Sequence, residues 1–243
     1  MEPEERASLD ERTPVGEIVV ASAAAAKLFE RVRVDYYNAG AIPLAEACAK
    51  AGADLSTVLA AIRETPAERI DWRAETARAL SHHIEQTHHV LTRSETNDLT
   101  SLSERVRQRH VSRFSELQEV QRLADVLEQE LLQHMMKEEQ ILFPFVTSME
   151  TAISAGDDPP VPFFGTVRNP IYMMVQEHDA VGDMLDEFRR LTNDYTIPAG
   201  ADTDLVELYR RMTALEEDIH FHIHLENNIY FPRSIALEQR AGG

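Results

Sequence analysis

The stretch His134-Met-Met-Lys-Glu138-Glu-Gln-Ile-Leu-Phe-Pro144 has a counterpart nearer the C-terminus, His222-Ile-His-Leu-Glu226-Asn-Asn-Ile-Tyr-Phe-Pro232. Both stretches follow one pattern, H-x-x-x-E-x-x-I-x-F-P. Residues four apart in an α-helix lie on the same face, one turn from each other. Each stretch therefore predicts a helix that presents one imidazole and one carboxylate to the same point.

Two further histidines extend this pattern into an internal repeat. His89 precedes His134 by 45 residues, and His178 precedes His222 by 44 residues. Nine of the ten histidines fall into four clusters that contain these four positions. Each half of the chain is thus predicted to contribute one helix with a histidine and one helix with His-x-x-x-Glu.

The repeat predicts a dinuclear metal site. A single His-x-x-x-Glu occurs often by chance, and a lone histidine on an apolar helix face is usually a hydrogen-bonded core residue. Two copies in matching contexts, with two histidines at matching offsets, favour metal binding over that interpretation. Two bridging carboxylates with imidazoles outside them suit iron, manganese or zinc. The predicted ligands are His89, His134, Glu138, His178, His222 and Glu226.

A rival ligand set uses the Glu-x-x-His spacing of the carboxylate-rich bundle proteins. Glu85-x-x-His88 and Glu217-x-x-His220 have this spacing. Glu139, next to Glu138, has Asn227 as its counterpart and so breaks the repeat. The methionine pairs at 135–136 and 173–174 are expected to pack in the core.

The fold class is predicted to be all-α, because only 9 of 243 residues are glycine and apolar residues recur at helical spacing. Long helical patterns cover about 73–91, 114–143, 169–192 and 202–230. Pro144 and Pro232 are expected to end the second and fourth helices. The polar stretch 92–113 could extend either neighbouring helix. Four such helices with short connections describe an antiparallel four-helix bundle.

Three regions are predicted along the chain. Residues 1–12 are expected to be a disordered tail, residues 13–69 a small helical domain, and residues 70–243 the bundle. The small domain contains helical patterns at 20–31, 43–51 and 55–64, and Asp54 is expected to cap the last of these.

Composition excludes several classes of protein. The net charge of −18 argues against a nucleic-acid partner. The single cysteine, Cys48, excludes a disulfide framework and a site of several thiolates. No apolar run approaches the roughly 20 residues that span a bilayer, and the first dozen residues do not resemble a secretion signal. We therefore expect a cytoplasmic protein that does not enter the membrane.

The two repeated stretches, together with Glu177-His178-Asp179 and the Thr-His-His run ending at His89, resemble the di-iron Repair of Iron Centres family. Leu28-Phe-Glu-x-x-x-Val34-Asp35-Tyr36 and Asp71-Trp72-Arg73 resemble the N-terminal region of that family. The resemblance implies a hemerythrin-like bundle behind a small N-terminal domain. It also implies two non-haem irons, terminal histidine ligands at 89, 134, 178 and 222, and bridging glutamates at 138 and 226.

The chain departs from this family after the Asp-Tyr pair. The family usually has two adjacent cysteines there, whereas this chain has Tyr37 and Asn38, followed by Ala39 and Gly40. Any role that the thiol pair has in the family is therefore not carried over.

The resemblance implies repair of iron-sulfur clusters damaged by nitrosative or oxidative stress. Iron donation and nitric oxide reduction at the di-iron centre are both implied, so enzymatic activity of the nitric oxide reductase type stays open. The alternative is a hemerythrin-like protein that binds or senses oxygen or nitric oxide without turnover. A helical interaction protein with a degenerate site is a third hypothesis. Expected partners are damaged iron-sulfur proteins and one of these gases, and an N-terminal interaction module would allow a homodimer.

Overall fold

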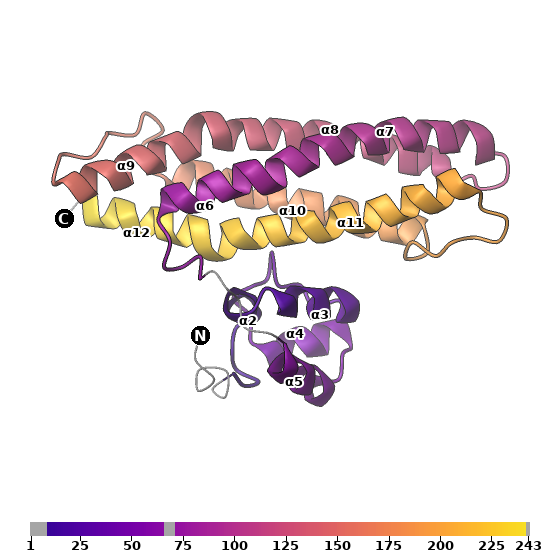
Figure 1. Cartoon of the computed structure of the whole chain (residues 1–243), viewed down its shortest axis with the longest axis horizontal. Coiled ribbons are helices and arrows are strands. Elements are labelled where there is room, and N and C mark those ends of the chain that lie inside the picture. Colours follow the sequence, from indigo (N-terminus) through magenta and orange to yellow (C-terminus); the bar gives the residue numbers. More distant parts are fainter. Residues whose placement is uncertain (1–8, 66–70, 242–243) are drawn as a thin grey trace. The chain divides into compact units, whose positions relative to one another are not determined.

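The computed structural model describes residues 9–65 and 71–241 and is helical throughout its regular structure (Figure 1). Among these residues the only β pairing is an isolated bridge between Pro14 and Pro43. The chain forms two compact units. One consists of residues 82–219, and the other combines the chain up to Ser81 with the chain from His220 onward. The prediction of an all-α fold is confirmed.

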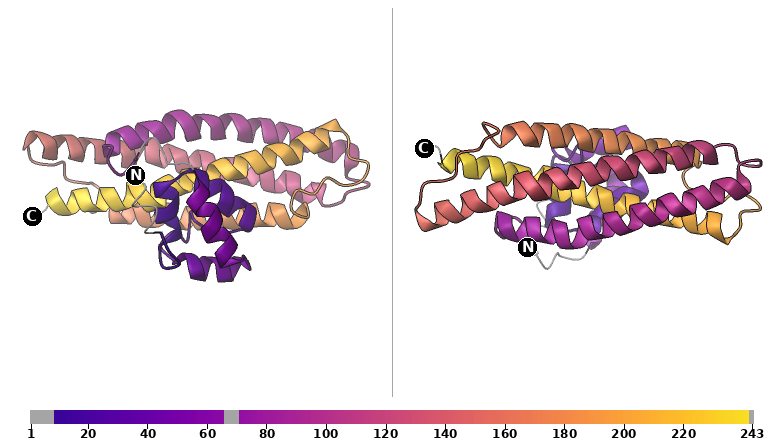
Figure 2. Two further views of the ribbon diagram at one scale, coloured as in Figure 1. Left: turned by 60° about the horizontal axis from the view of Figure 1, so that its bottom comes forward. Right: turned by 90° about the horizontal axis from the view of Figure 1, so that it is seen from above.

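The unit of residues 82–219 is a four-helix bundle, as predicted. Its long helices run alongside one another in both views of Figure 2. The helical segments from residue 77 onward, in chain order, are α6 (Ala77–His83), η1 (Ile84–His89), α7 (Val90–His110), α8 (Leu117–Lys137), η2 (Glu138–Leu142), α9 (Phe143–Ala155), α10 (Arg168–Leu191) and α11 (Thr203–Leu225). α6 begins before the unit of residues 82–219, and α11 ends after it. The η segments are single π-helical turns. The chain continues beyond α11 through η3 (Glu226–Tyr230) and α12 (Phe231–Ala241).

Apolar side chains at helical spacing explain why these segments pack. In α8 the buried positions recur every three or four residues, and His134 and Glu138 continue the same stripe. In α10 His178 lies between Met174 and Val181 on the buried face. The predicted ligands of α8 and α10 therefore occupy core positions. The buried apolar residues before His134 on α8 are Leu117, Val120, Leu123, Ala124, Leu127 and Leu131.

The prediction that Pro144 and Pro232 end helices is wrong. Each proline is the second residue of a new α-helical segment, α9 or α12, which directly follows a π turn. A proline inside a regular α-helix lacks the N–H for its hydrogen bond and clashes with the carbonyl four residues earlier. The π turn contains one extra residue and shifts that carbonyl, so the helix can continue through the proline.

The polar stretch 92–113 extends the first long helix, which reaches His110. Its buried face carries hydroxyl side chains, such as Thr92, Thr96 and Ser103, beside Leu99 and Val106. The Thr96 hydroxyl donates to the carbonyl of Thr92, which satisfies it inside the helix. The apolar pattern is consequently weak although the face is buried.

The second unit contains four short helices, namely α2 (Val15–Ala21), α3 (Ala24–Val32), α4 (Leu44–Ala51) and α5 (Leu55–Glu64). The helix predicted at 20–31 is two helices, because the backbone of Ser22 is extended. Asp54 caps α5 as predicted, since its side chain accepts from the N–H of Thr57 at 2.8 Å. Phe29 and Tyr36 are fully buried in the core of these helices.

Parts of the predicted domain division lie outside the described residues. The tail predicted at 1–12 falls largely on residues 1–8, and the boundary at 69/70 falls within 66–70. Within the described ranges, no helix has the length and apolar character needed to cross a membrane.

Candidate metal centre

Four of the predicted ligands gather within the bundle of residues 82–219. His89 and Glu138 are fully buried, and His134 and His178 are almost so. The two oxygens of Glu138 face different imidazoles: Oε2 lies 3.4 Å from Nε2 of His89, and Oε1 lies 3.3 Å from Nε2 of His134. Nε2 of His178 lies 3.0 Å from Nε2 of His134. A carboxylate in this position can bridge two cations.

The remaining pair comes from the end of α11 and the start of η3. Nε2 of His222 lies 2.9 Å from Oε1 of Glu226, one helical turn along the chain. Both side chains are buried. This is the same arrangement as that of His134 and Glu138, as the sequence repeat requires.

The six side chains form two groups of buried donors. The first consists of His89, Glu138, His222 and Glu226, and the second of His134, Glu138, His178 and Glu226. Within each group the donor atoms lie within 4.8 Å of one another. Both glutamates belong to both groups, and each histidine belongs to one. Among the described residues, neither group takes in the rival pairs Glu85/His88 and Glu217/His220.

Carboxylates behind two of the imidazoles fix their orientation. Nδ1 of His89 donates to Oε1 of Glu139 at 2.7 Å, and Arg93 donates to both oxygens of Glu139 at 2.8 Å. Nδ1 of His134 donates to Oε2 of Glu177 at 2.8 Å, and Lys137 also donates to Glu177. With the proton on Nδ1, the lone pair of Nε2 points to the site.

These contacts keep both supporting carboxylates charged. The hydrogen bond from His134, together with Lys137, lowers the pKa of Glu177 to about 2. Burial alone would raise the pKa of Glu139, but hydrogen bonds from Arg93 and His89 lower it below its ordinary value. The sequence interpretation assigned no role to either residue. The available signals were Arg93, one turn after His89, and Glu177, directly before His178.

The three π turns coincide with the ligands. η1 ends at His89, η2 begins at Glu138, and η3 begins at Glu226. A π turn widens the helix locally and changes which consecutive side chains face inward, and such turns are frequent at functional sites. His88 and His89 are both buried, although neighbouring residues of a regular helix point about 100° apart. The sequence pattern did not predict these turns.

The other histidines of the clusters have separate partners. Nδ1 of His88 lies 2.9 Å from Oδ1 of Asp218. Burial lowers the pKa of His224 to about 3, so this imidazole is neutral.

Only one methionine of each pair packs in the core as expected. Met135 and Met174 are buried, whereas Met136 and Met173 are about half exposed.

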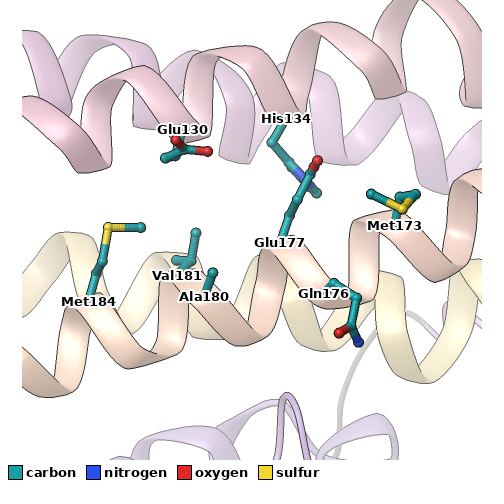
Figure 3. A pocket seen from close by; sticks show the side chains of 8 residues that line it. All are labelled: Glu130, His134, Met173, Gln176, Glu177, Ala180, Val181 and Met184. Atoms are coloured by element: carbon teal, nitrogen blue, oxygen red, sulfur yellow. The ribbon is translucent and has the colours of Figure 1, made fainter.

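A cavity of about 130 Å³ lies between α8 and α10 and reaches His134 (Figure 3). Glu177 points across it toward His134. Its lining mixes apolar, amide and carboxylate side chains beside a predicted ligand. The lining residues are Glu130, His134, Met173, Gln176, Glu177, Ala180, Val181 and Met184.

The buried donor set is more favourable with bound metal ions than without them. Glu138 and Glu226 are 0% exposed and share both donor groups, so two carboxylates are buried close together. Like charges in such a position repel, and burial disfavours each charge separately. Cations between the carboxylates remove both costs. Four imidazoles and two carboxylates suit iron, as they suit manganese or zinc.

Comparison with known families agrees with this chemistry. Residues 80–234, more than half of the chain, match the family described as the hemerythrin HHE cation binding domain. The chain belongs to the hemerythrin HHE cation-binding family. All six candidate ligands lie within the matched range of this hemerythrin domain. Its buried histidines and glutamates are donors suited to binding cations such as iron.

The N-terminal part of this hemerythrin-family chain matches a second family. Residues 11–65 match a domain of unknown function, DUF542. That range contains the four short helices α2 to α5. The predicted resemblance to a two-part protein is therefore confirmed.

Curated relatives of this hemerythrin-family chain share nearly its full length. The iron-sulfur cluster repair protein YtfE of Edwardsiella ictaluri is 33% identical over 91% of this chain and 96% of the relative. The proteins of that name from Shigella boydii serotype 4 and Escherichia coli O157:H7 are each 32% identical, over 93% of this chain and 97% of the relative.

Proposed function

We propose that this chain is a non-haem di-iron protein that supports the repair of iron-sulfur clusters damaged by nitric oxide or oxidants. The observation that carries the proposal is the pair of buried donor groups that share Glu138 and Glu226. A shared pair of carboxylates fits two adjacent cations. The relatives, which align over more than nine-tenths of this chain, are iron-sulfur cluster repair proteins, and this supports the same assignment.

In this proposal His89, His134, His178 and His222 would each hold one iron, and Glu138 and Glu226 would be shared by both. Bound iron would supply one-electron redox chemistry and a cation that can be transferred. Glu139 and Glu177 hold the protons on Nδ1 of His89 and His134, so that Nε2 of each imidazole stays available as a donor. The buried apolar stripes on α8 and α10 exclude bulk water from the site.

Two activities are compatible with this arrangement, namely iron donation to a damaged cluster and reduction of nitric oxide. The cavity beside His134, of about 130 Å³, is well above the roughly 10–15 Å³ needed to hold one water, so it has room for a diatomic gas. We therefore keep both activities in the proposal. Damaged iron-sulfur proteins are the proposed partners, in the cytoplasm, and self-association into a homodimer is proposed through the N-terminal unit.

Tyr37 and Asn38 favour a second candidate function, binding or sensing of oxygen or nitric oxide without turnover. Residues 37 and 38 are tyrosine and asparagine, so neither offers a thiol, and the Tyr37 ring stacks on His220 at 3.8 Å between centroids. Reduced protein given excess nitric oxide and a chemical reductant distinguishes the candidates. Repeated formation of nitrous oxide indicates catalysis, whereas a stable nitrosyl adduct without nitrous oxide indicates binding alone.

The di-iron proposal is tested by metal analysis after expression in iron-replete medium. We expect two irons per chain, with absorption bands of bridged ferric ions after oxidation. His222→Ala should lower the iron content, whereas His82→Ala, which removes an exposed histidine, should leave it unchanged. Wild-type protein without iron would overturn the proposal.

Repair itself is tested with an iron-sulfur enzyme whose cluster has been damaged by nitric oxide. We expect the iron-loaded chain to restore the activity of that enzyme under anaerobic conditions. The iron-depleted His222→Ala variant should restore little. Equal recovery with both proteins would show that the metal centre is not responsible.

A further inference from the structure

We propose that the loop of residues 35–40, here called the anchor loop, is a positioning element for His222 and Glu226. By holding the helical segment 220–228, it controls how fast the metal at these ligands is released. The inference rests on the proposed di-iron function and deepens it. All its contacts lie within the unit that combines the chain up to Ser81 with the chain from His220 onward.

The anchor loop is internally ordered by one carboxylate. Oδ1 of Asp35 accepts from the N–H groups of Tyr37, Asn38 and Ala39 at 2.9–3.2 Å. Three backbone donors on one oxygen fix the course of the loop. The loop therefore presents its remaining groups in a defined geometry.

The loop contacts the segment before the ligand pair through Tyr37. The Tyr37 ring stacks face to face on His220, with an interplanar angle of 9°. Nδ1 of His220 lies 2.9 Å from Oε1 of Glu30. The hydroxyl of Tyr36 donates to the same oxygen of Glu30 at 3.0 Å. His220 is therefore held by the Tyr37 ring and by Glu30, which Tyr36 in turn fixes.

The loop contacts the segment after the ligand pair through two asparagines. Nδ2 of Asn227 donates to the carbonyl of Tyr37 at 3.2 Å and to Oδ1 of Asn38 at 3.3 Å. Nδ2 of Asn228 donates to the carbonyl of Tyr36 at 3.0 Å. A Cβ atom on Gly40 would overlap the Asn228 side chain, so this glycine is what permits the close approach.

These contacts hold the face of the helix opposite the ligands. His220 and His224 lie one turn apart, and His222 lies two residues from each, about 200° around the helix. His224 is buried and its ring lies 5.6 Å from that of Tyr36. The loop thus supports the back of a segment whose front carries His222 and Glu226.

The supports of the ligands differ between the two halves of the repeat. His89 and His134 are oriented individually, by Glu139 and Glu177. The position that corresponds to Glu139 is Asn227, whose amide is directed to the anchor loop. The second half therefore has no carboxylate at this position, and the residue there contacts the anchor loop instead.

Loosening of the loop should affect one metal ion more than the other. His222 belongs to only one of the two donor groups, and the second group contains His134 and His178 in its place. Loss of the Tyr37 stack lets segment 220–228 shift, which weakens the hold of His222. Glu226 belongs to both groups, so both ions lose some support, but release of the ion in the first group, which also loses the hold of His222, should accelerate more.

The experiment follows transfer of ferrous iron from the full-length, iron-loaded chain to an excess of a coloured ferrous chelator under anaerobic conditions. We expect two release phases in the wild type. Tyr37→Ala should accelerate one phase by roughly three- to tenfold, the equivalent of one aromatic contact. Tyr37→Phe keeps the stack and should release iron like the wild type. Tyr172→Ala, which removes an exposed tyrosine, is the matched control.

A second variant and a spectroscopic readout keep the test decisive if Tyr37→Ala folds poorly. Asn227→Ala removes the amide contacts to the loop and should accelerate the same phase. With cobalt(II) in place of iron, both variants should change the visible spectrum of one of two equivalents. Unchanged phases in both variants, or equal acceleration of both phases, would overturn the inference. A wild type that binds no iron would instead overturn the di-iron proposal itself.

Discussion

At the scale of single residues, the centre depends on two carboxylates that are wholly removed from water. Glu138 offers one oxygen to each of two imidazoles at 3.3–3.4 Å. Without cations its buried charge is costly, and the proposed metal ions would offset that cost. The same residue should therefore have opposite effects on stability and on metal binding.

We expect Glu138→Gln to lower the iron content and to stabilise the metal-free protein. Removal of a buried charge should raise the free energy of unfolding of the metal-free chain by about 1 kcal/mol or more. Metal analysis and denaturant unfolding of the chelator-treated protein measure the two effects. A less stable metal-free variant would contradict the assignment of Glu138 as a charge that needs cations.

Glu139→Gln should leave all six ligands in place but weaken metal binding. The substitution removes the charge that orients the imidazole of His89, and such supporting contacts typically contribute 10- to 100-fold to affinity. Competition with a chelator of known affinity measures the change. Glu85→Gln is the control, since Glu85 belongs to neither donor group.

The sequence alone predicted the six candidate ligands because their spacing repeats. It could not predict Glu139 and Glu177 as supports. Their partners, His89 and His134, come from other helices, so the hydrogen bonds depend on packing and leave no pattern along the chain.

At the scale of helices, the four-helix bundle was predicted correctly and the helix ends were not. Pro144 and Pro232 ordinarily stop a helix, but each follows a π turn that accommodates it. A π turn arises from one extra residue whose cost is offset by tertiary contacts and ligands. Local propensity contains no information about that compensation.

The start of α11 gives the fold a definite dependence on pH. Oδ1 of Asp202 accepts from the N–H of Leu205 at 3.0 Å, and Arg109 pairs with the same carboxylate at 2.8 Å. The hydrogen bond from Arg109, with that from Leu205, lowers the pKa of Asp202 below its ordinary value. A lowered carboxyl pKa stabilises the fold above the unfolded value of about 3.9, and this contribution is lost as the pH falls further.

We therefore expect acidification below about pH 4 to destabilise the wild type more than Asp202→Asn. At pH 7 the variant should be the less stable of the two, because it loses the charge that pairs with Arg109. Urea unfolding across this range measures both effects. Parallel pH profiles for the two proteins would show that Asp202 is not responsible.

At the scale of the whole molecule, folding and metal loading are linked. The donors come from segments between His89 and Glu226, so the unfolded chain has no assembled site. A ligand that binds only the native state raises its stability, by about 4 kcal/mol at a thousandfold excess over Kd. The net charge of −18 gives no hint of this, because it does not distinguish the two proposed metal-binding carboxylates from the other acidic residues.

Addition of ferrous iron to the metal-free protein should therefore raise the melting temperature in anaerobic calorimetry. The rise should increase with free iron concentration, and it should be much smaller in His222→Ala. An equal rise in both proteins would indicate iron bound elsewhere.

The contact between the anchor loop and segment 220–228 also sets an order of events during synthesis. Glu30 and His220 are 190 residues apart, and so are Tyr37 and Asn227. The N-terminal helices leave the ribosome first, yet their contact surface on α11 is translated almost last. Contacts of such long sequence separation form late in folding. The nascent chain must therefore keep Tyr36 and Tyr37 without their final partners until translation is nearly complete, and only then can His222 and Glu226 be set for iron.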